Sequence, residues 1–379
     1  MKTFRYRLYP SGTQRRLLES TVETCCRLYN DCLAERKEAW EAEKRNVRKV
    51  EQLRRVKAVK ATNPYAAGVH SHVLQVAVAD LDRAFGSFFR RVKAGEEPGY
   101  PRFKGRDRFD SFGLKEYGNG WKVDGKRLRL SGIGRVAVRW HRSLEGVPKT
   151  LRVRRTAGGW YACITCETEP TPLPATGREV GIDVGLSSLV ATSDGETIGH
   201  PRWYRREQAR LRVLQRRVAR RKKGGANRGK AVRAVARHAL HVANRRKDFL
   251  GKLAHSLVER YDLIALEDLR IPNMVKNRHL AKSIMDSGWG YFRTHLAHKA
   301  AEAGRVVVLV DPAYTSQTCS ACGNRFPQHI GLSIRHVSCS CGLSLDRDIN
   351  AARNILRAGR ARREPTSALA GVSREAAPL

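Results

Sequence analysis

The chain has 379 residues, with 73 Lys and Arg against 36 Asp and Glu, and its formal net charge at pH 7 is +37. Self-repulsion of this size opposes a compact state unless a polyanion neutralises it, so we expect DNA, RNA or both as partners. No stretch approaches the roughly 18 apolar residues of a membrane span, and the charged residues after Met1 do not form a signal-peptide pattern. These features predict a soluble, intracellular protein of roughly two or three domains with no membrane partner.

The first half of the chain changes its hydrophobic period twice. Residues 3–8 have the pattern of a strand, and residues 14–94 carry apolar side chains at three- and four-residue spacing, which predicts helices. Between residues 95 and 172 the period falls to two, in short runs separated by Gly-rich turns. We predict a small β-barrel or sandwich formed by residues 1–13 and 95–172, with the helices of residues 14–94 inserted into it.

The second half alternates between strand and helix patterns. After a Pro-rich linker, an apolar strand begins at Val180, and its hairpin mate and two basic helices follow. Further patterns predict a strand at residues 261–266, a helix at 283–303 and a strand at 305–310. Such alternation implies an α/β sheet whose catalytic carboxylates would lie at strand ends.

Three acidic residues stand where predicted strands end or a predicted helix begins. Asp183 lies in GIDVG, Glu267 ends an apolar run, and Asp348 precedes a helical pattern. Carboxylates brought together from distant segments are the oxygen ligands with which Mg²⁺ holds phosphate groups. Gly181 and Gly185 would allow a phosphate to approach Asp183.

Each of these acids also has an ordinary structural interpretation. Asp183 could be a strand-end residue, and Asp348 could be a helix N-cap, for which Asp346 is the nearest competitor. Asp268 directly follows Glu267, but Glu267 is nearer the apolar run and is the better candidate ligand. The prediction therefore rests on the three acids together.

Four of the nine cysteines have the spacing of a zinc ribbon, a structural site in which Zn²⁺ takes four ligands. They are Cys319, Cys322, Cys339 and Cys341. The second pair is one residue shorter than the usual CxxC knuckle, so the fourth ligand is open between Cys341, His336 and His329.

The remaining cysteines do not predict a second metal site. Cys163 and Cys166 form a CxxC within an alternating strand pattern, where their side chains would point to opposite faces. Cys25, Cys26 and Cys32 fall in a helical pattern and are predicted to be buried as small apolar side chains.

Residues 201–250 carry 18 Lys and Arg against two acidic residues. Such a run is often only a solvated face, but here it joins the first two acidic motifs, which favours contacts with phosphates. Gly224 and Gly225 could act as a hinge between two helices that form a lid. The candidate nucleic-acid contacts are Arg216, Arg217, Arg220, Arg221, Lys222 and Lys223.

Several motifs resemble one protein family in their order and spacing. GIDVG, ALEDL followed by IPNMVKN, TSQTCSACGN, and CSCGLSLDRDINAARNIL resemble the RuvC-like nuclease core of the transposon-encoded TnpB proteins, the compact relatives of type V CRISPR effectors. RLYPSGTQRRLLE and PRFKGRDRFDSF are similar to the N-terminal segments of that family. The resemblance covers residues 1–358, and the short second cysteine knuckle departs from the family pattern.

The resemblance implies a fold and a division into domains. A RuvC-like domain with the RNase H fold would comprise residues 173–314 and 343–358, with residues 201–250 as its basic lid and the zinc ribbon of residues 315–342 inserted. The barrel would be of the wedge type, and the helical insertion would be a recognition domain. The remaining residues 359–379 lack apolar periodicity and are predicted to be a disordered tail.

The resemblance also implies an activity, namely RNA-guided DNA cleavage next to a short flanking motif. The partners would be a guide RNA from the transposon end and double-stranded target DNA, with the protein acting as a monomer on its RNA in the cytoplasm, at the prokaryotic nucleoid. Asp183, Glu267 and Asp348 would hold two Mg²⁺ ions, or Mn²⁺, roughly 4 Å apart. Zn²⁺ would be structural, and base pairing would choose the target sequence.

Two other functions are consistent with parts of the pattern. A regulator that binds DNA without cutting it would be expected to have lost at least one of the acids, and none is lost. A transposase that joins DNA ends would use the same metal chemistry.

Overall fold

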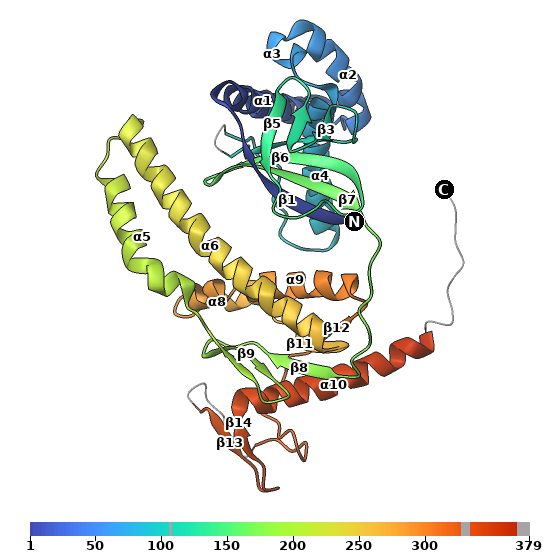
Figure 1. Ribbon diagram of the computed structural model, residues 1–379, viewed down its shortest axis with the longest axis vertical. Coiled ribbons are helices and arrows are strands. Elements are labelled where there is room, and N and C mark those ends of the chain that lie inside the picture. Colours follow the sequence, from blue (N-terminus) through green and yellow to red (C-terminus); the bar gives the residue numbers. More distant parts are fainter. Residues whose placement is uncertain (106–107, 327–333, 370–379) are drawn as a thin grey trace. The chain divides into compact units, whose positions relative to one another are not determined.

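The computed structural model describes residues 1–105, 108–326 and 334–369 (Figure 1). The chain divides into two compact units, Met1–Glu169 and Pro170–Leu379, and each is described by itself. No helix in the described ranges is both long and apolar enough to cross a membrane.

The first unit is built on a seven-stranded antiparallel sheet with the order β2-β6-β7-β1-β5-β4-β3. Its strands are β1 (Lys2–Tyr9), β2 (Ser111–Leu114), β3 (Trp121–Asp124), β4 (Arg127–Leu130), β5 (Gly134–Arg139), β6 (Val147–Thr156) and β7 (Gly159–Glu167). The N-terminal strand β1 lies between β7 and β5 and buries Phe4, Tyr6 and Leu8 on one face. The outer strands β2 and β3 do not pair within the described residues, so the sheet is an open, barrel-like one.

Four helices lie between β1 and β2 in the sequence, as the predicted insertion required. They are α1 (Gly12–Glu43), α2 (Lys49–Thr62), α3 (Pro64–Ala67) and α4 (Ser71–Lys93). A capping box formed by Ser11 and Gln14 starts α1 two residues before the predicted helical stretch. Helix α1 ends before Lys44, because the left-handed φ of 53° at this residue does not continue an α-helix.

The cysteines of this unit lie as the sequence predicted. Cys166 is fully buried on the core face of β7, whereas Cys163 lies on the opposite, partly exposed face. Cys25, Cys26 and Cys32 are buried on the inner side of α1. The CxxC in β7 therefore does not form a metal site.

The second unit contains a five-stranded sheet with the order β10-β9-β8-β11-β12. Its strands are β8 (Glu179–Asp183), β9 (Ser188–Thr192), β10 (Thr197–Gly199), β11 (Leu263–Glu267) and β12 (Val306–Val310). Strands β8, β11 and β12 run parallel, β9 pairs antiparallel with β8, and β10 pairs antiparallel with β9. This mixed sheet is the RNase H-like arrangement that the resemblance predicted.

Helices cover both faces of this sheet, as Figure 1 shows. They are α5 (Trp203–Ala219), α6 (Ala226–Arg260), α7 (Ile271–Met274), α8 (Ala281–Ser287), α9 (Trp289–Glu302) and α10 (Arg347–Leu369). Ile264 and Leu266 face the core shared with α6 and α9, whereas Leu263 and Ala265 pack with Ile355 of α10. The helix predicted over residues 283–303 is divided at Gly288, whose φ is 70°.

Helix α10 approaches the sheet so closely that two glycines are needed. A side chain at Gly181 of β8 would collide with the carbonyl oxygen of Ala352, and one at Gly359 of α10 would collide with Ala265. Gly181 therefore serves helix packing, and our expectation that it makes room for a phosphate is wrong. A side chain at Gly185 would collide with the carbonyl oxygen of Ser188 at the start of β9.

The tail predicted to be disordered over residues 359–379 is helical as far as Leu369, so this part of the prediction is wrong. Arg360 and Arg363 both pair with Glu179 at the start of β8, at 2.6 and 3.2 Å. Arg362 donates a hydrogen bond to the carbonyl oxygen of Leu309. These contacts with the sheet stabilise the C-terminal part of α10, which has no apolar stripe. Residues 370–379 lie outside the described residues.

Candidate active site and cysteine cluster

The three predicted acids line one cavity of about 520 Å³ in the second unit. Asp183 is the last residue of β8 and Glu267 is the last residue of β11, so two neighbouring parallel strands deliver both carboxylates to the same edge of the sheet. Asp348 lies in the first turn of α10, which packs across both strands. Residues 183, 267 and 348 are therefore brought together by topology rather than by sequence proximity.

The electrostatics of the cavity favour a bound cation. Burial, together with the nearby Glu267 and Asp348 carboxylates, raises the pKa of Asp183 to about 8, while Arg347 opposes the increase. Burial also raises the pKa values of Glu267 and Asp348. Carboxylates that share a site in this way repel one another when ionised. A hard divalent cation with oxygen ligands fits this donor set, because it removes the repulsion.

The acids next to the candidate ligands have other partners. The Asp268 carboxylate is exposed and pairs with Arg293 at 2.5 Å. Asp346 accepts hydrogen bonds from the backbone N–H groups of Asp348 and Ile349, at 2.8 and 3.3 Å, and so caps α10. The cap is thus Asp346, and the carboxylate of Asp348 is left to face the cavity.

Two residues of the cavity were not identified from the sequence. The hydroxyl of Thr315 donates a hydrogen bond to Glu267 Oε1, which lowers the pKa of that carboxyl against the effect of burial. Arg335 places its Nη1 atom 3.4 Å from Asp348 Oδ2 and also contacts Ser187. Arg335 has no local sequence signal, since it is one of 73 basic residues, whereas Thr315 begins the TSQTCSACGN motif, which was interpreted through its cysteines alone.

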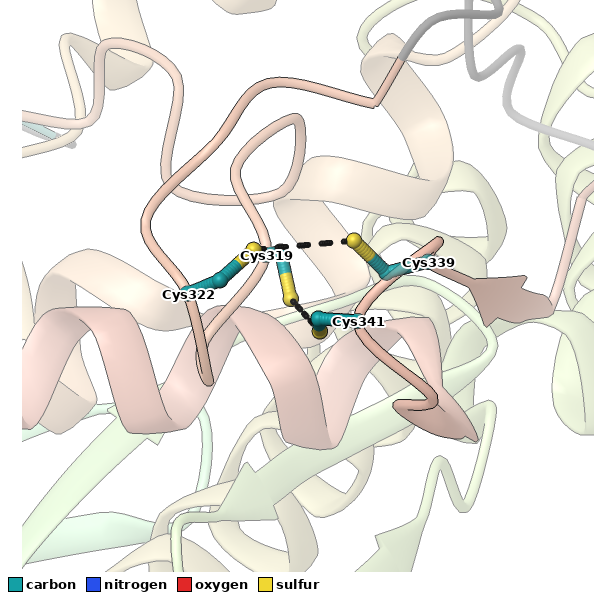
Figure 2. Close-up of side chains that lie close together, drawn as sticks. All are labelled: Cys319, Cys322, Cys339 and Cys341. Carbon is teal, nitrogen blue, oxygen red and sulfur yellow. Dashed lines mark hydrogen bonds between the residues drawn. The ribbon is translucent and has the colours of Figure 1, made fainter.

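The four ribbon cysteines converge, as Figure 2 shows. Their Sγ atoms all lie within 4.8 Å of one another, and the Cys319–Cys341 and Cys322–Cys339 pairs are 3.6 Å apart. Cys339 and Cys341 lie between β13 (His336–Ser338) and β14 (Ser344–Asp346), which form a short hairpin. The shortened knuckle thus still delivers two sulfur atoms to the cluster.

The histidine alternatives for the fourth ligand gain no support. His336 lies on β13 and its Nε2 atom is 2.8 Å from the hydroxyl of Ser344, outside the sulfur cluster. His329 lies outside the described residues. A hydrogen bond from the backbone N–H of Cys341 is the main cause that lowers the pKa of Cys339 to about 7. A thiolate that forms near neutral pH suits a Zn²⁺ ligand.

The six candidate nucleic-acid contacts are exposed and lie away from the acids. Four of them, Arg216 to Arg221, belong to the last turn of α5 and the residues that follow it, and Lys222 and Lys223 lie in the turn before α6. Gly224 in this turn has a φ of 81°. None of the six lines the cavity of the acids. Their role in binding nucleic acid stays a prediction.

An RNase H-like sheet, three acids at one of its edges, and a four-cysteine ribbon inserted before the third acid define the class of RuvC-like nuclease cores. Three family models match the chain: "Probable transposase" at residues 163–278, "Cas12f1-like, TNB domain" at 289–355 and "Helix-turn-helix domain" at 1–45. The second model spans the cysteine cluster and Asp348. The third covers β1 and α1, which do not form a helix-turn-helix on their own.

Related proteins extend the match to nearly the whole chain. A protein of Streptomyces pristinaespiralis, named as a candidate RNA-guided DNA endonuclease, is 39% identical over 94% of this chain and 89% of its own. InsQ of Escherichia coli K12, named in the same way, is 32% identical over 95% of this chain and 93% of its own. A TnpB-like protein of Methanocaldococcus jannaschii is 32% identical over 34% of this chain and 30% of its own. The chain belongs to the TnpB family.

A solved structure supports the fold. The cryo-EM structure of a Cas12f1 complex with sgRNA and target DNA matches with a TM-score of 0.59, covering 90% of this chain and 82% of that one. The sequence identity is 16%, so this likeness concerns the fold alone.

Proposed function

We propose that the protein is a transposon-encoded, RNA-guided DNA endonuclease that hydrolyses phosphodiester bonds beside a short flanking motif. The observation that carries the proposal is the convergence of Asp183, Glu267 and Asp348 in one cavity. The similarity to proteins named as RNA-guided DNA endonucleases supports the guide RNA and the double-stranded DNA target. The protein would act as a monomer on its RNA, in the prokaryotic cytoplasm.

Asp183, Glu267 and Asp348 would hold Mg²⁺, or Mn²⁺ in its place. Two such ions would supply Lewis-acid stabilisation of the phosphoryl oxygens and a nucleophilic water at neutral pH. The chain's own residues shape the cavity around this chemistry. Thr315 orients the Glu267 carboxylate, and the guanidinium of Arg335 lies at the rim, where it can contact a DNA phosphate.

The other parts of the chain would bind and orient nucleic acid. Zn²⁺ held by the four cysteines would fix the two loops that carry them, and the basic residues 216–223 would contact phosphates as part of a lid. The open sheet of the first unit and helices α1–α4 would act as the wedge and recognition parts that hold the RNA–DNA heteroduplex by its shape.

Cleavage of a plasmid library tests the proposal. Protein co-expressed with the RNA transcribed across the end of its reading frame should cut guide-matched plasmids next to one enriched flanking motif, only with Mg²⁺ or Mn²⁺. Asp183→Ala and Glu267→Ala should abolish cutting and leave RNA binding nearly unchanged.

Asp268→Ala is the matched control, because this neighbour of Glu267 is exposed and lies outside the cavity. It should retain cutting. Guide-dependent binding without cutting by the unmodified protein would point to a regulator instead. A joined DNA product formed without RNA would point to a transposase.

A further inference from the structure

Helix α10 carries two buried asparagines one turn apart, Asn350 and Asn354, with exposed fractions of 0% and 9%. Their side chains are directed at the loop of residues 315–320. A buried amide without partners is costly, so such residues normally satisfy a defined set of hydrogen bonds. Both asparagines lie beyond the acid of the DRDINAARN motif and have no role in the chemistry described above.

The two asparagines hold different parts of the loop. Asn354 Nδ2 donates to the carbonyl oxygens of Thr315 and Thr318, at 2.9 and 2.7 Å. Asn350 Nδ2 also donates to the carbonyl oxygen of Thr318, at 2.8 Å, and its Oδ1 accepts the backbone N–H of Ser320 at 2.8 Å. Of the two asparagines, only Asn354 has a hydrogen bond to Thr315.

This loop connects the two candidate metal centres. At one end, the Thr315 hydroxyl donates to Glu267 in the acid cavity. At the other end, Cys319 belongs to the sulfur cluster, and its backbone N–H donates to Asn324 at 2.9 Å. Residues 315–318 therefore connect the cysteine cluster to the contact with Glu267. The two asparagines of α10 hold this segment by hydrogen bonds.

We propose that Asn354 is a positioning residue: it fixes Thr315, and through Thr315 the carboxylate of Glu267, in the geometry that binds the divalent cation. Asn350 secures the cysteine end of the same loop. The inference rests on the proposed function and adds to it a residue outside the cavity that holds the Thr315 end of this loop against Glu267. Small displacements at such sites matter, since a misplacement of about 1 Å can reduce a rate by roughly 100-fold.

The test compares Asn354→Ala, Asn350→Ala, Thr315→Val and Thr315→Ser in the full chain bound to its RNA. Three quantities are measured: zinc content, Mn²⁺ affinity from electron paramagnetic resonance, and the Mg²⁺ concentration that gives half-maximal single-turnover cleavage. Asn354→Ala and Thr315→Val should weaken Mn²⁺ binding and raise the half-saturating Mg²⁺ concentration about tenfold while zinc is retained. Thr315→Ser keeps the hydroxyl and should match the unmodified protein.

Asn350→Ala is the matched control, because it removes a buried asparagine of the same helix without touching Thr315. It should change the half-saturating Mg²⁺ concentration less than about threefold. The double variant Asn354→Ala with Thr315→Val should be no worse than the more severe single variant, because both changes break one path.

The proposal would be overturned if the two changes multiplied their effects on the half-saturating Mg²⁺ concentration in the double variant. It would also be overturned if Thr315→Val and Thr315→Ser had the same half-saturating Mg²⁺ concentration. Loss of zinc from Asn354→Ala in proportion to lost activity would also overturn it, because the residue would then only support the ribbon. If the unmodified complex does not cleave DNA but Asn354→Ala and Thr315→Val still weaken Mn²⁺ binding, the proposed function fails and the positioning role stands.

Discussion

Asp183 makes the metal-free protein sensitive to pH. Its pKa is about 8 in the folded chain, against an ordinary value of 3.8, so the folded protein keeps a proton that the unfolded chain has released. The free energy of unfolding should therefore fall as pH rises through this interval, by at most about 1.4 kcal/mol per pH unit. Asp183→Asn removes the titrating carboxyl, and the melting temperature of this variant should fall less steeply between pH 5 and 8. Thermal unfolding in buffer without Mg²⁺, with zinc retained, measures the difference.

Asp268→Asn is the appropriate control for this pH series, because the Asp268 carboxylate is exposed and paired with Arg293. It should keep the slope of the unmodified protein. Added Mg²⁺ should raise the melting temperature of the unmodified protein more at pH 8 than at pH 6, since the cation competes with the proton on Asp183. Parallel slopes for the Asp183→Asn variant and the unmodified chain would contradict the assigned pKa.

At this scale, the residues that could be identified from the sequence are those whose position in the chain reveals their role. Asp183 and Glu267 end apolar strands, and the cysteines have a characteristic spacing. Thr315 and Arg335 act through contacts with residues 48 and 13 positions away, which no local pattern encodes. Conversely, Asp183 and Gly181, two positions apart, were both linked to phosphate binding, although Gly181 is there because α10 packs against it.

Among the structural elements, the cysteine ribbon offers a test of the shortened knuckle. Cys341→Ser should release zinc and loosen the β13–β14 hairpin, because a tetrahedral thiolate site loses a ligand that His336 does not replace. Zinc content by mass spectrometry under native conditions measures the loss. Cys163→Ser in β7 is the matched control and should leave the zinc content unchanged, because Cys163 is not one of the four clustered cysteines. Full zinc occupancy in Cys341→Ser would mean that another residue completes the site.

The C-terminal helix offers a second test at this scale. A chain that ends after Arg363 keeps the ion pairs of Arg360 and Arg363 with Glu179, whereas a chain that ends after Ala358 loses them. Exposed ion pairs contribute roughly 0.2–1 kcal/mol each, so the shorter chain should be less stable by about 1 kcal/mol. In a domain of about 150–250 residues, this lowers the melting temperature by about 2–4 °C. Equal melting temperatures for both truncations would show that the last turns of α10 contribute nothing.

The helices and strands were predictable wherever the hydrophobic period is strong. The alternating runs of β4 to β7 and the apolar strands β8, β11 and β12 follow the patterns directly. The C-terminal end of α10 was missed because its support is electrostatic and distant: Arg360 and Glu179 are 181 residues apart in the sequence. The division of the 283–303 helix depends on a single left-handed residue, Gly288, in a segment whose composition otherwise favours helix.

For the whole molecule, charge is the dominant property. Many basic side chains are already neutralised locally, such as Lys37 by Glu41, Arg45 by Glu43 and Glu51, and Lys252 by Asp248. In the described part of the chain, the residues of the α5–α6 turn form no such ion pair. Unpaired cations of this kind can release counterions from DNA or RNA, which makes binding dependent on salt.

Replacing Arg221, Lys222 and Lys223 with Gln should therefore weaken DNA binding by the protein–RNA complex and flatten its salt dependence. The slope of log K against log salt should shrink by about 0.9 for each duplex phosphate contact that is lost. Replacing Lys37, Arg45 and Lys252 with Gln lowers the net charge by the same amount but removes cations that already have acidic partners. This control should change the slope much less. Equal changes in the two triple variants would mean that total charge, rather than the position of the α5–α6 turn, governs DNA binding.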